Sequence, residues 1–146
     1  MEFEIPVGYG GGAYAMYFEF PELKTNFQNF LDQNGTDIET IGGIFPLSAK
    51  ITSFDGNKYY YIQDVEIRVC FPSETDCTAQ VDGVFYEEDL NGSADNDIPL
   101  AAGLQNVKEL MMGEYFRLEV VMTVNQGQIT PYNQLSRLDM VFEVVE

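Results

Sequence analysis

The chain contains no histidine and no tryptophan, and only two of its 146 residues are cysteines. Without histidine there is no Ser-His-Asp or Cys-His catalytic arrangement, no imidazole metal site and no HExxH zinc motif. No nucleophile, base and orienting group can be named together, so the sequence predicts that the protein is not an enzyme. The missing tryptophan removes the usual stacking platform of a sugar-binding cleft, although the nine tyrosines can supply aromatic rings.

Positive charge is also scarce, since 7 Lys and Arg stand against 24 Asp and Glu for a formal charge of −17. A surface this acidic repels phosphate backbones, which excludes nucleic-acid binding except by mimicry. Hydrophobic residues make up 45% of the chain, too many for a disordered acidic tail. At this length we expect a single domain over residues 1–146 that buries roughly two-thirds of its unfolded surface.

The chain has no run of 18 or more apolar residues, so the sequence predicts no transmembrane segment. Its start, Met1 to Pro6, lacks the basic and apolar regions of a signal peptide. Two alternatives stay open: the protein remains where it is made, or it is a mature domain whose leader was removed and to which Met1 was added.

The two cysteines, Cys70 and Cys77, enclose a short polar stretch with a proline that indicates a turn between strand ends. Cysteines at this spacing across a turn can reach disulfide distance, so we expect a Cys70–Cys77 bond and an oxidising compartment. Two reduced thiols are the alternative. A two-cysteine metal site is not expected, because no third or fourth soft ligand is present.

Most of the chain alternates apolar and polar residues with a period of two, as half-buried antiparallel strands do. One face of such a strand packs and the other is wet, so Arg117 and Glu119 are expected on a solvent face. About seven strands separated by turns favour a single antiparallel β-sandwich over a barrel. The expected strands are residues 2–7, 13–20, 47–51, 61–71, 81–87, 115–124 and 138–144.

Two segments indicate short helices. Leu23, Phe27, Phe30 and Leu31 fall on one helical stripe that Asn34-Gly35 closes. Residues 104–112 form a shorter stripe that stops at Gly113. We expect one or two short helices that cap the open ends of the sandwich with their apolar stripes in the core. A groove for a partner is the alternative role of these stripes.

Acidic residues concentrate between Asp64 and Asp97, where ten acids accompany a single base, Arg68. The densest part places oxygen-bearing side chains at alternate positions around Gly92, as calcium-binding loops do. These candidate calcium ligands are Asp89, Asn91, Ser93, Asp95 and Asp97. The spacing departs from an EF-hand, whose glycine is sixth and whose Glu is twelfth. A calcium site and a solvated acidic loop are the two alternatives.

Three consecutive tyrosines, Tyr59, Tyr60 and Tyr61, form the densest aromatic cluster. Alternation sends Tyr59 and Tyr61 to one face and Tyr60 to the other, so at least one ring is expected at the surface. An exposed ring there suits contact with a ligand or partner. Tyrosines at the margin of a strand core are the alternative.

Three stretches carry a resemblance to a protein family: an N-terminal strand followed by Asn26–Leu31, Gly35-Thr36 and Ile41; Leu47–Ser53 followed by Ile62–Ile67; and Val107–Leu110 followed by strands 116–123 and 139–144. In this order of elements the chain resembles short exported lipoproteins of Bacteroidota-type bacteria, whose function is unknown. The resemblance implies a β-sandwich held at the cell envelope by an N-terminal lipid, with no catalytic residues to transfer. The chain departs from the family in lacking the leader and the lipid-bearing cysteine, and in having the Cys70/Cys77 pair.

Together these observations favour a non-enzymatic cell-envelope or extracellular binding domain, the mature part of a lipoprotein, whose partner is a protein or a glycan. The expected location is periplasmic, outer-membrane-anchored or extracellular, with calcium as the one candidate cofactor. Two other classes stay open: a structural component of a larger assembly such as a virion or secretion machine, and an acidic inhibitor of a basic partner.

Overall fold

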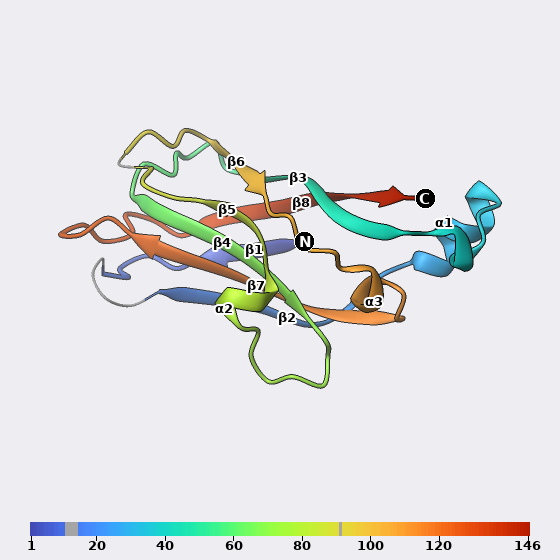
Figure 1. The fold of residues 1–146 in the computed structure, drawn as a ribbon. Helices are drawn as coiled ribbons and strands as arrows, with labels where there is room; N and C mark the ends of the chain where they lie inside the picture. The colour runs from blue at the N-terminus through green and yellow to red at the C-terminus, as the bar shows by residue number, and fades with distance from the viewer. Residues whose placement is uncertain (11–14, 91) are drawn as a thin grey trace.

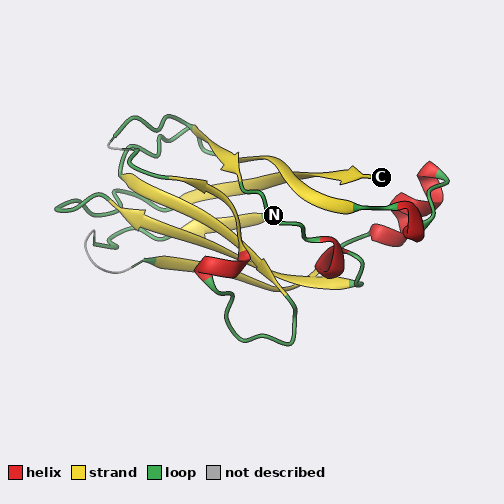
Figure 2. Cartoon of the chain, in the orientation of Figure 1, coloured by secondary structure: helices red, strands yellow, loops and turns green. Residues whose placement is uncertain are grey.

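The structure is a computed structural model that describes residues 1–10, 15–90 and 92–146. Strands account for most of the regular structure (Figure 1, Figure 2). In chain order they are β1 (Glu2–Ile5), β2 (Met16–Lys24), β3 (Gly43–Ser53), β4 (Ile62–Cys70), β5 (Gly83–Glu87), β6 (Asp97–Ala102), β7 (Tyr115–Val124) and β8 (Gln134–Val145).

Within the described residues, the 8 strands form one antiparallel sheet in the order β1-β8-β3-β6-β5-β4-β7-β2. The sheet folds over so that β1, β8, β3 and β6 face β5, β4, β7 and β2 in two layers (Figure 1). A short pairing of β5 with β6 at Phe85 and Tyr86 joins the layers. On the other side the edge strands β1 and β2 approach, with ring centroids of Phe3 and Phe18 4.8 Å apart. The predicted antiparallel β fold is confirmed, as one sheet that nearly closes into a barrel.

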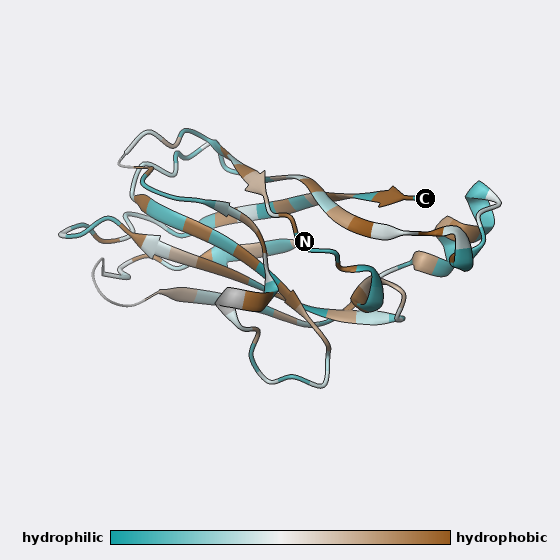
Figure 3. Ribbon diagram, viewed as in Figure 1, coloured by the Kyte–Doolittle hydropathy of each residue, from teal (hydrophilic) through white to brown (hydrophobic). Residues whose placement is uncertain are grey.

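Alternate residues of the strands fill the space between the layers, which produces the alternating bands along β4 in Figure 3. Ile67 of β4, Leu118 of β7 and Leu138 of β8 are completely buried. Each such aliphatic side chain contributes about 1.5–3 kcal/mol by leaving water. The outward positions between them are free to carry charged and aromatic groups.

The strand β6 is missing from the sequence-based prediction. Pro99 at its centre argues against an interior strand, because proline cannot donate to a ladder. In the structure, β6 pairs with β3 over Asp97 to Leu100 and with β5 only at Ala101 and Ala102. Pro99 therefore lies where β6 has a paired neighbour on one side only, and its missing N–H removes no ladder bond.

Short helical segments complete the fold: α1 (Phe27–Asn34), the 3-10 turn η1 (Ile38–Thr40), α2 (Ala79–Asp82) and α3 (Lys108–Met111). The predicted first helix begins too early, because Leu23 still belongs to β2 and pairs with Phe116 beyond a register shift. Buried Phe27 and Leu31 confirm that α1 packs its apolar stripe on the core. Among the described helices, none is long and apolar enough to cross a membrane.

Candidate functional site

The outer face of the β5-β4-β7-β2 layer carries aromatic and acidic side chains in one row. Strand pairing places Tyr17 of β2 opposite Val121 of β7, and Val121 opposite Glu66 of β4. Glu66 in turn lies opposite Tyr86 of β5. Directly paired residues share a face of the sheet. Tyr17 is 54% and Tyr86 46% exposed, so two accessible rings flank a carboxylate.

A hollow of about 440 Å³ lies on this face. Four carboxylates and one guanidinium line it and leave a formal charge of −3: Asp64, Glu66, Glu88, Asp89 and Arg68. We call these five residues, with Tyr17 and Tyr86, the acidic–aromatic face. Carboxylates attract a cation by charge, and ring faces attract it by their quadrupole, so the arrangement suits a cationic group.

Hydrogen bonds fix one edge of the acidic–aromatic face. The Asp64 carboxylate accepts a bond from the Thr123 hydroxyl at 3.0 Å and another from the backbone N–H of Asp89 at 3.0 Å. Asp64 thus ties β4 to β7 and to the loop after β5. The side chains of Asp89 and Glu88 stay exposed beside it, where a partner can reach their carboxylates.

The single cation of the face is already paired. Arg68 Nε donates to Glu66 at 2.8 Å, and the guanidinium carbon lies 5.8 Å from the centroid of the Tyr17 ring. Burial opposes the charged guanidinium, but the bond to Glu66 outweighs it and raises the pKa of Arg68 above its ordinary value. Arg68 therefore stays charged and shows how a guanidinium sits between a ring and a carboxylate on this surface.

A second acidic cluster lies beside the first, on β2, β7 and the loop between the cysteines. Arg117 bonds Glu19 at 3.0 Å and Glu119 at 3.1 Å, and Glu119 also accepts the backbone N–H of Cys77 at 3.2 Å. Carboxylate oxygens of Glu19, Asp76 and Glu119 lie within 4.8 Å of one another. Because Arg117 bridges two of these carboxylates, the cluster is an ion-pair network that joins the sheet to the loop.

The burial of Arg117 and Glu119 corrects the sequence-based expectation of a solvent face. The two side chains are 7% and 1% exposed. Alternation places them on the outer face of the sheet, as predicted, but Asp76 and Cys77 at the end of the Cys70–Cys77 loop lie against Glu119 there. Burial opposes the charge of Arg117, yet Glu119 and Glu19 outweigh it and raise the pKa of the guanidinium.

The predicted disulfide is confirmed. Cys70 ends β4, and its sulfur is bonded to that of Cys77 at 2.02 Å, with the Cα atoms 5.6 Å apart. Both cysteines are buried. The bond closes the loop 71–76 and holds the Cys77 N–H against Glu119, so it supports the ion-pair network directly.

The candidate calcium ligands turn to different partners where the structure describes them. The Asp89 carboxylate accepts a bond from Gln63 at 3.4 Å, whereas that of Asp95 lies 3.6 Å from the Lys58 ammonium. Asp97 begins β6 and is paired with β3.

The Ser93 hydroxyl donates to the backbone oxygen of Leu90. Asn91 lies outside the described residues. Calcium binding by this loop stays a prediction.

The three tyrosines divide between the two faces as alternation predicts. Tyr59 and Tyr61 are completely buried, while Tyr60 is 43% exposed. The Tyr61 ring meets those of Tyr60 and Tyr132 edge-on, at centroid distances of 5.8 and 6.0 Å. Of the three, Tyr60 is the one whose ring a ligand can reach, and ligand contact there stays a prediction.

The two buried tyrosines belong to a polar network inside the sheet. The hydroxyls of Tyr59 and Ser136 lie 2.7 Å apart, and the Tyr61 hydroxyl donates to the Gln134 side chain. Gln134 in turn donates to the backbone oxygen of Asn57 at 2.8 Å. Burial raises the pKa of Tyr59 to about 12 and raises that of Tyr61 further. Both hydroxyls stay protonated and serve the fold, because water does not reach them.

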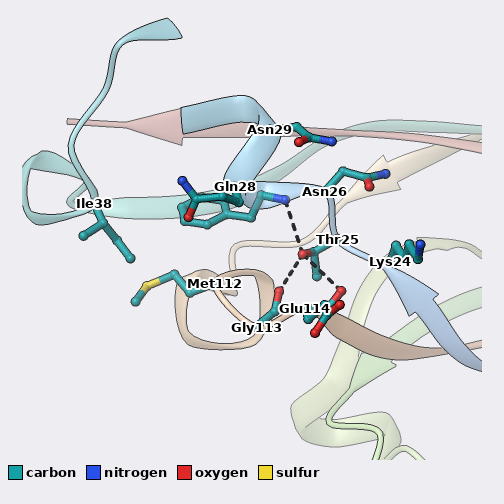
Figure 4. A pocket seen from close by; sticks show the side chains of 10 residues that line it. Lys24, Thr25, Asn26, Gln28, Asn29, Ile38, Met112, Gly113 and Glu114 are labelled. Atoms are coloured by element: carbon teal, nitrogen blue, oxygen red, sulfur yellow. Dashed lines mark hydrogen bonds between the residues drawn. The ribbon is translucent and has the colours of Figure 1, made fainter. Parts of the chain in front are cut away.

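A further hollow of about 440 Å³ lies where α1 meets the turn before β7 (Figure 4). Its centre is Thr25, whose hydroxyl donates to the Gly113 oxygen at 2.5 Å and accepts the Phe27 N–H at 3.3 Å. Lys24 and Glu114 are among its lining residues and have opposite formal charges. The hollow lies at the junction between α1 and the turn before β7, and its lining residues provide no cluster of like charge for a ligand.

Comparisons with protein-family models, with curated proteins and with solved structures found no match.

Proposed function

We propose that the chain is a non-enzymatic binding domain whose acidic–aromatic face binds a basic protein partner. The observation that carries this proposal is the row in which the exposed rings of Tyr17 and Tyr86 flank Glu66. Arginine and lysine side chains fit such a surface, because they pair with carboxylates and lie over aromatic faces.

The overall charge supports the same partner class. A chain of formal charge −17 attracts a basic protein at long range and raises the rate of encounter. The exposed carboxylates of Glu88 and Asp89 then provide local contacts at the rim of the hollow. A glycan, the other expected partner, would use the tyrosine rings and depend little on these carboxylates.

Fluorescence anisotropy with a labelled octa-arginine peptide tests the face. We expect Glu88→Gln combined with Asp89→Asn to weaken binding by about threefold to tenfold, because two exposed carboxylates are lost. Tyr17→Ala combined with Tyr86→Ala should weaken it similarly with no change of charge. The loss from the charge variant should shrink as salt is added.

Two matched controls separate the face from general charge. Asp32→Asn with Glu39→Gln removes the same charge at the α1 end of the molecule (Figure 1). Tyr115→Ala removes an exposed tyrosine at the far end of β7. Equal losses in the control and face variants would show that binding follows net charge alone, and would reject the proposal.

The location proposed for this domain is the cell envelope or the extracellular space, as the mature part of a lipoprotein. The buried Cys70–Cys77 bond supports it, because such bonds persist in oxidising compartments. Thiol alkylation in intact cells of the native host should leave both cysteines unmodified. Mass spectrometry of the same protein should detect an N-terminal lipid. Alkylated Cys70 and Cys77 would contradict this location.

A further inference from the structure

The strand β8 is paired along only part of one edge. β3 pairs with it from Ser136 to Val145, whereas β1 pairs with it only from Gln134 to Arg137. Met1 adds a last pair of bonds, to the N–H and the oxygen of Leu138. Figure 1 shows β8 running on beyond the N-terminus. Residues 139–145 therefore have β3 on one side and no described strand on the other.

The backbone groups on this open edge follow from strand geometry. Leu138 directs its N–H and C=O to the β1 side, and alternate residues of a strand point their backbone groups the same way. Met140, Phe142 and Val144 therefore direct theirs to the open edge. Val145 points to β3 instead, where its oxygen accepts the Gly42 N–H at 2.7 Å.

Side-chain burial changes at the same place. The inward-facing residues of β8 are buried up to Leu138 and only partly buried at Met140, Phe142 and Val144. These three still pack against the core, and the Phe142 ring lies 5.7 Å from that of Phe85. The hydrophobic core is thus incompletely covered along the stretch of β8 that lacks a second neighbour.

The edge strand β2 is protected against further pairing, whereas the open stretch of β8 is not. β2 carries Pro21 and a register shift between Phe20 and Leu23, both of which discourage pairing with a further strand. Residues 139–145 contain no proline. The register shift in their pairing with β3 lies on β3, between Pro46 and Ser48, and not on β8. Three valines and a phenylalanine in this stretch favour the extended conformation.

We propose that residues 139–145 of β8 bind an extended segment of a partner protein, which adds a strand antiparallel to β8 in line with β1. The segment spans seven residues, about 23 Å at strand rise. It alternates apolar residues, which cover Met140, Phe142 and Val144, with basic residues opposite Glu143 and opposite Asp139, whose carboxylate also accepts a bond from Arg137. Cross-strand pairs of opposite charge stabilise such a register. A second copy of the chain is disfavoured, because each carries a formal charge of −17.

The register dictates the probe, the acetylated and amidated peptide Thr-Val-Lys-Val-Thr-Val-Lys. Its lysines fall opposite Glu143 and Asp139 when it lies antiparallel to β8. Methylating the amide nitrogens of its last two valines, which would face β8, should weaken binding by about tenfold or more. Methylating those of the first lysine and second threonine, which face away, is the matched control and should leave the β8 bonds intact.

Amide exchange measured by NMR locates the site on the protein. In the free chain, the N–H groups of Met140, Phe142 and Val144 should exchange faster than those of their neighbours on the β3 side. The peptide should slow these three selectively. Glu143→Lys should weaken binding by about threefold, and Glu109→Lys at α3 should match the wild type apart from a smaller general charge effect.

Three results would overturn the inference. The first is binding without added protection at these amides, and the second is equal affinity of the two methylated peptides. The third is a dimer in sedimentation equilibrium with these amides protected before peptide is added, because the occupant would then be a second copy. None of these outcomes depends on the acidic–aromatic face, whose residues stay unchanged in every variant.

Discussion

Replacing Arg117 by methionine is expected to destabilise the fold by about 3–5 kcal/mol, because it strands a buried carboxylate. Glu119 is 1% exposed, and its carboxylate accepts hydrogen bonds from the Arg117 side chain and from the Cys77 N–H. After the change only the bond from Cys77 remains. Methionine keeps most of the volume of the arginine stem, so packing loss contributes little. The cost arises from the uncompensated charge.

The chain contains its own control for this experiment. Arg137 bonds Asp139 through Nε at 2.8 Å, with the same two-residue spacing along a strand, but the two side chains are 44% and 53% exposed. Arg137→Met should cost about 0–1 kcal/mol, because water screens an exposed pair. The comparison isolates burial closely, since the spacing is the same and the two acids, Glu119 and Asp139, differ by one methylene.

Urea unfolding at neutral pH measures both variants. A cost of about 3 kcal/mol corresponds to a midpoint shift of about 1–3 M at the slope typical of small proteins in urea. Adding Glu119→Gln to Arg117→Met should recover part of the loss, because the buried charge is removed. Equal midpoints for Arg117→Met and Arg137→Met would refute the reasoning, as would a double variant less stable than Arg117→Met alone.

Three further predictions follow from other parts of the structure. The Cys70–Cys77 bond closes a loop of sequence separation 7, so its reduction should lower the free energy of unfolding by about 2–3 kcal/mol. Urea titrations with and without reductant measure this loss, and an unchanged midpoint would contradict it. Burial raises the pKa of Tyr59 to about 12, so its contribution to the free energy of unfolding is complete below pH about 10 and is lost as the pH rises to about 12. Tyr59→Phe should therefore flatten the alkaline part of a profile of stability against pH. If the loop from Asp89 to Asp97 binds calcium, millimolar calcium should raise the melting temperature; an unchanged melting curve would reject that site.

Periodicity predicts the interior of this fold well because burial in a sheet follows alternate residues. Ile67 and Leu118 lie inside for that reason, and the same rule divides Tyr60 from its two neighbours. The disulfide is also readable from the sequence, since a short polar turn brings Cys70 and Cys77 within reach of each other.

The acidic–aromatic face could not be predicted, because it depends on register between strands far apart in the chain. Tyr17 and Tyr86 are separated by 69 positions, and only the β2-β7-β4-β5 order brings them to either side of Glu66. The burial of Glu119 depends on a loop that folds back over the sheet, and alternation carries no signal for such a cover. Long-range pairing decides both features.

The place of β8 in the sheet also determines when the fold can form. β8 is the last of the eight described strands in chain order, yet it lies between β1, the first of them, and β3. During synthesis, β1 and β3 therefore emerge long before the strand that joins them, and their layer cannot form until β8 has been made. Such non-local pairing slows folding and leaves strand edges exposed meanwhile. The high negative charge makes incompletely folded chains repel one another, which protects them against self-association.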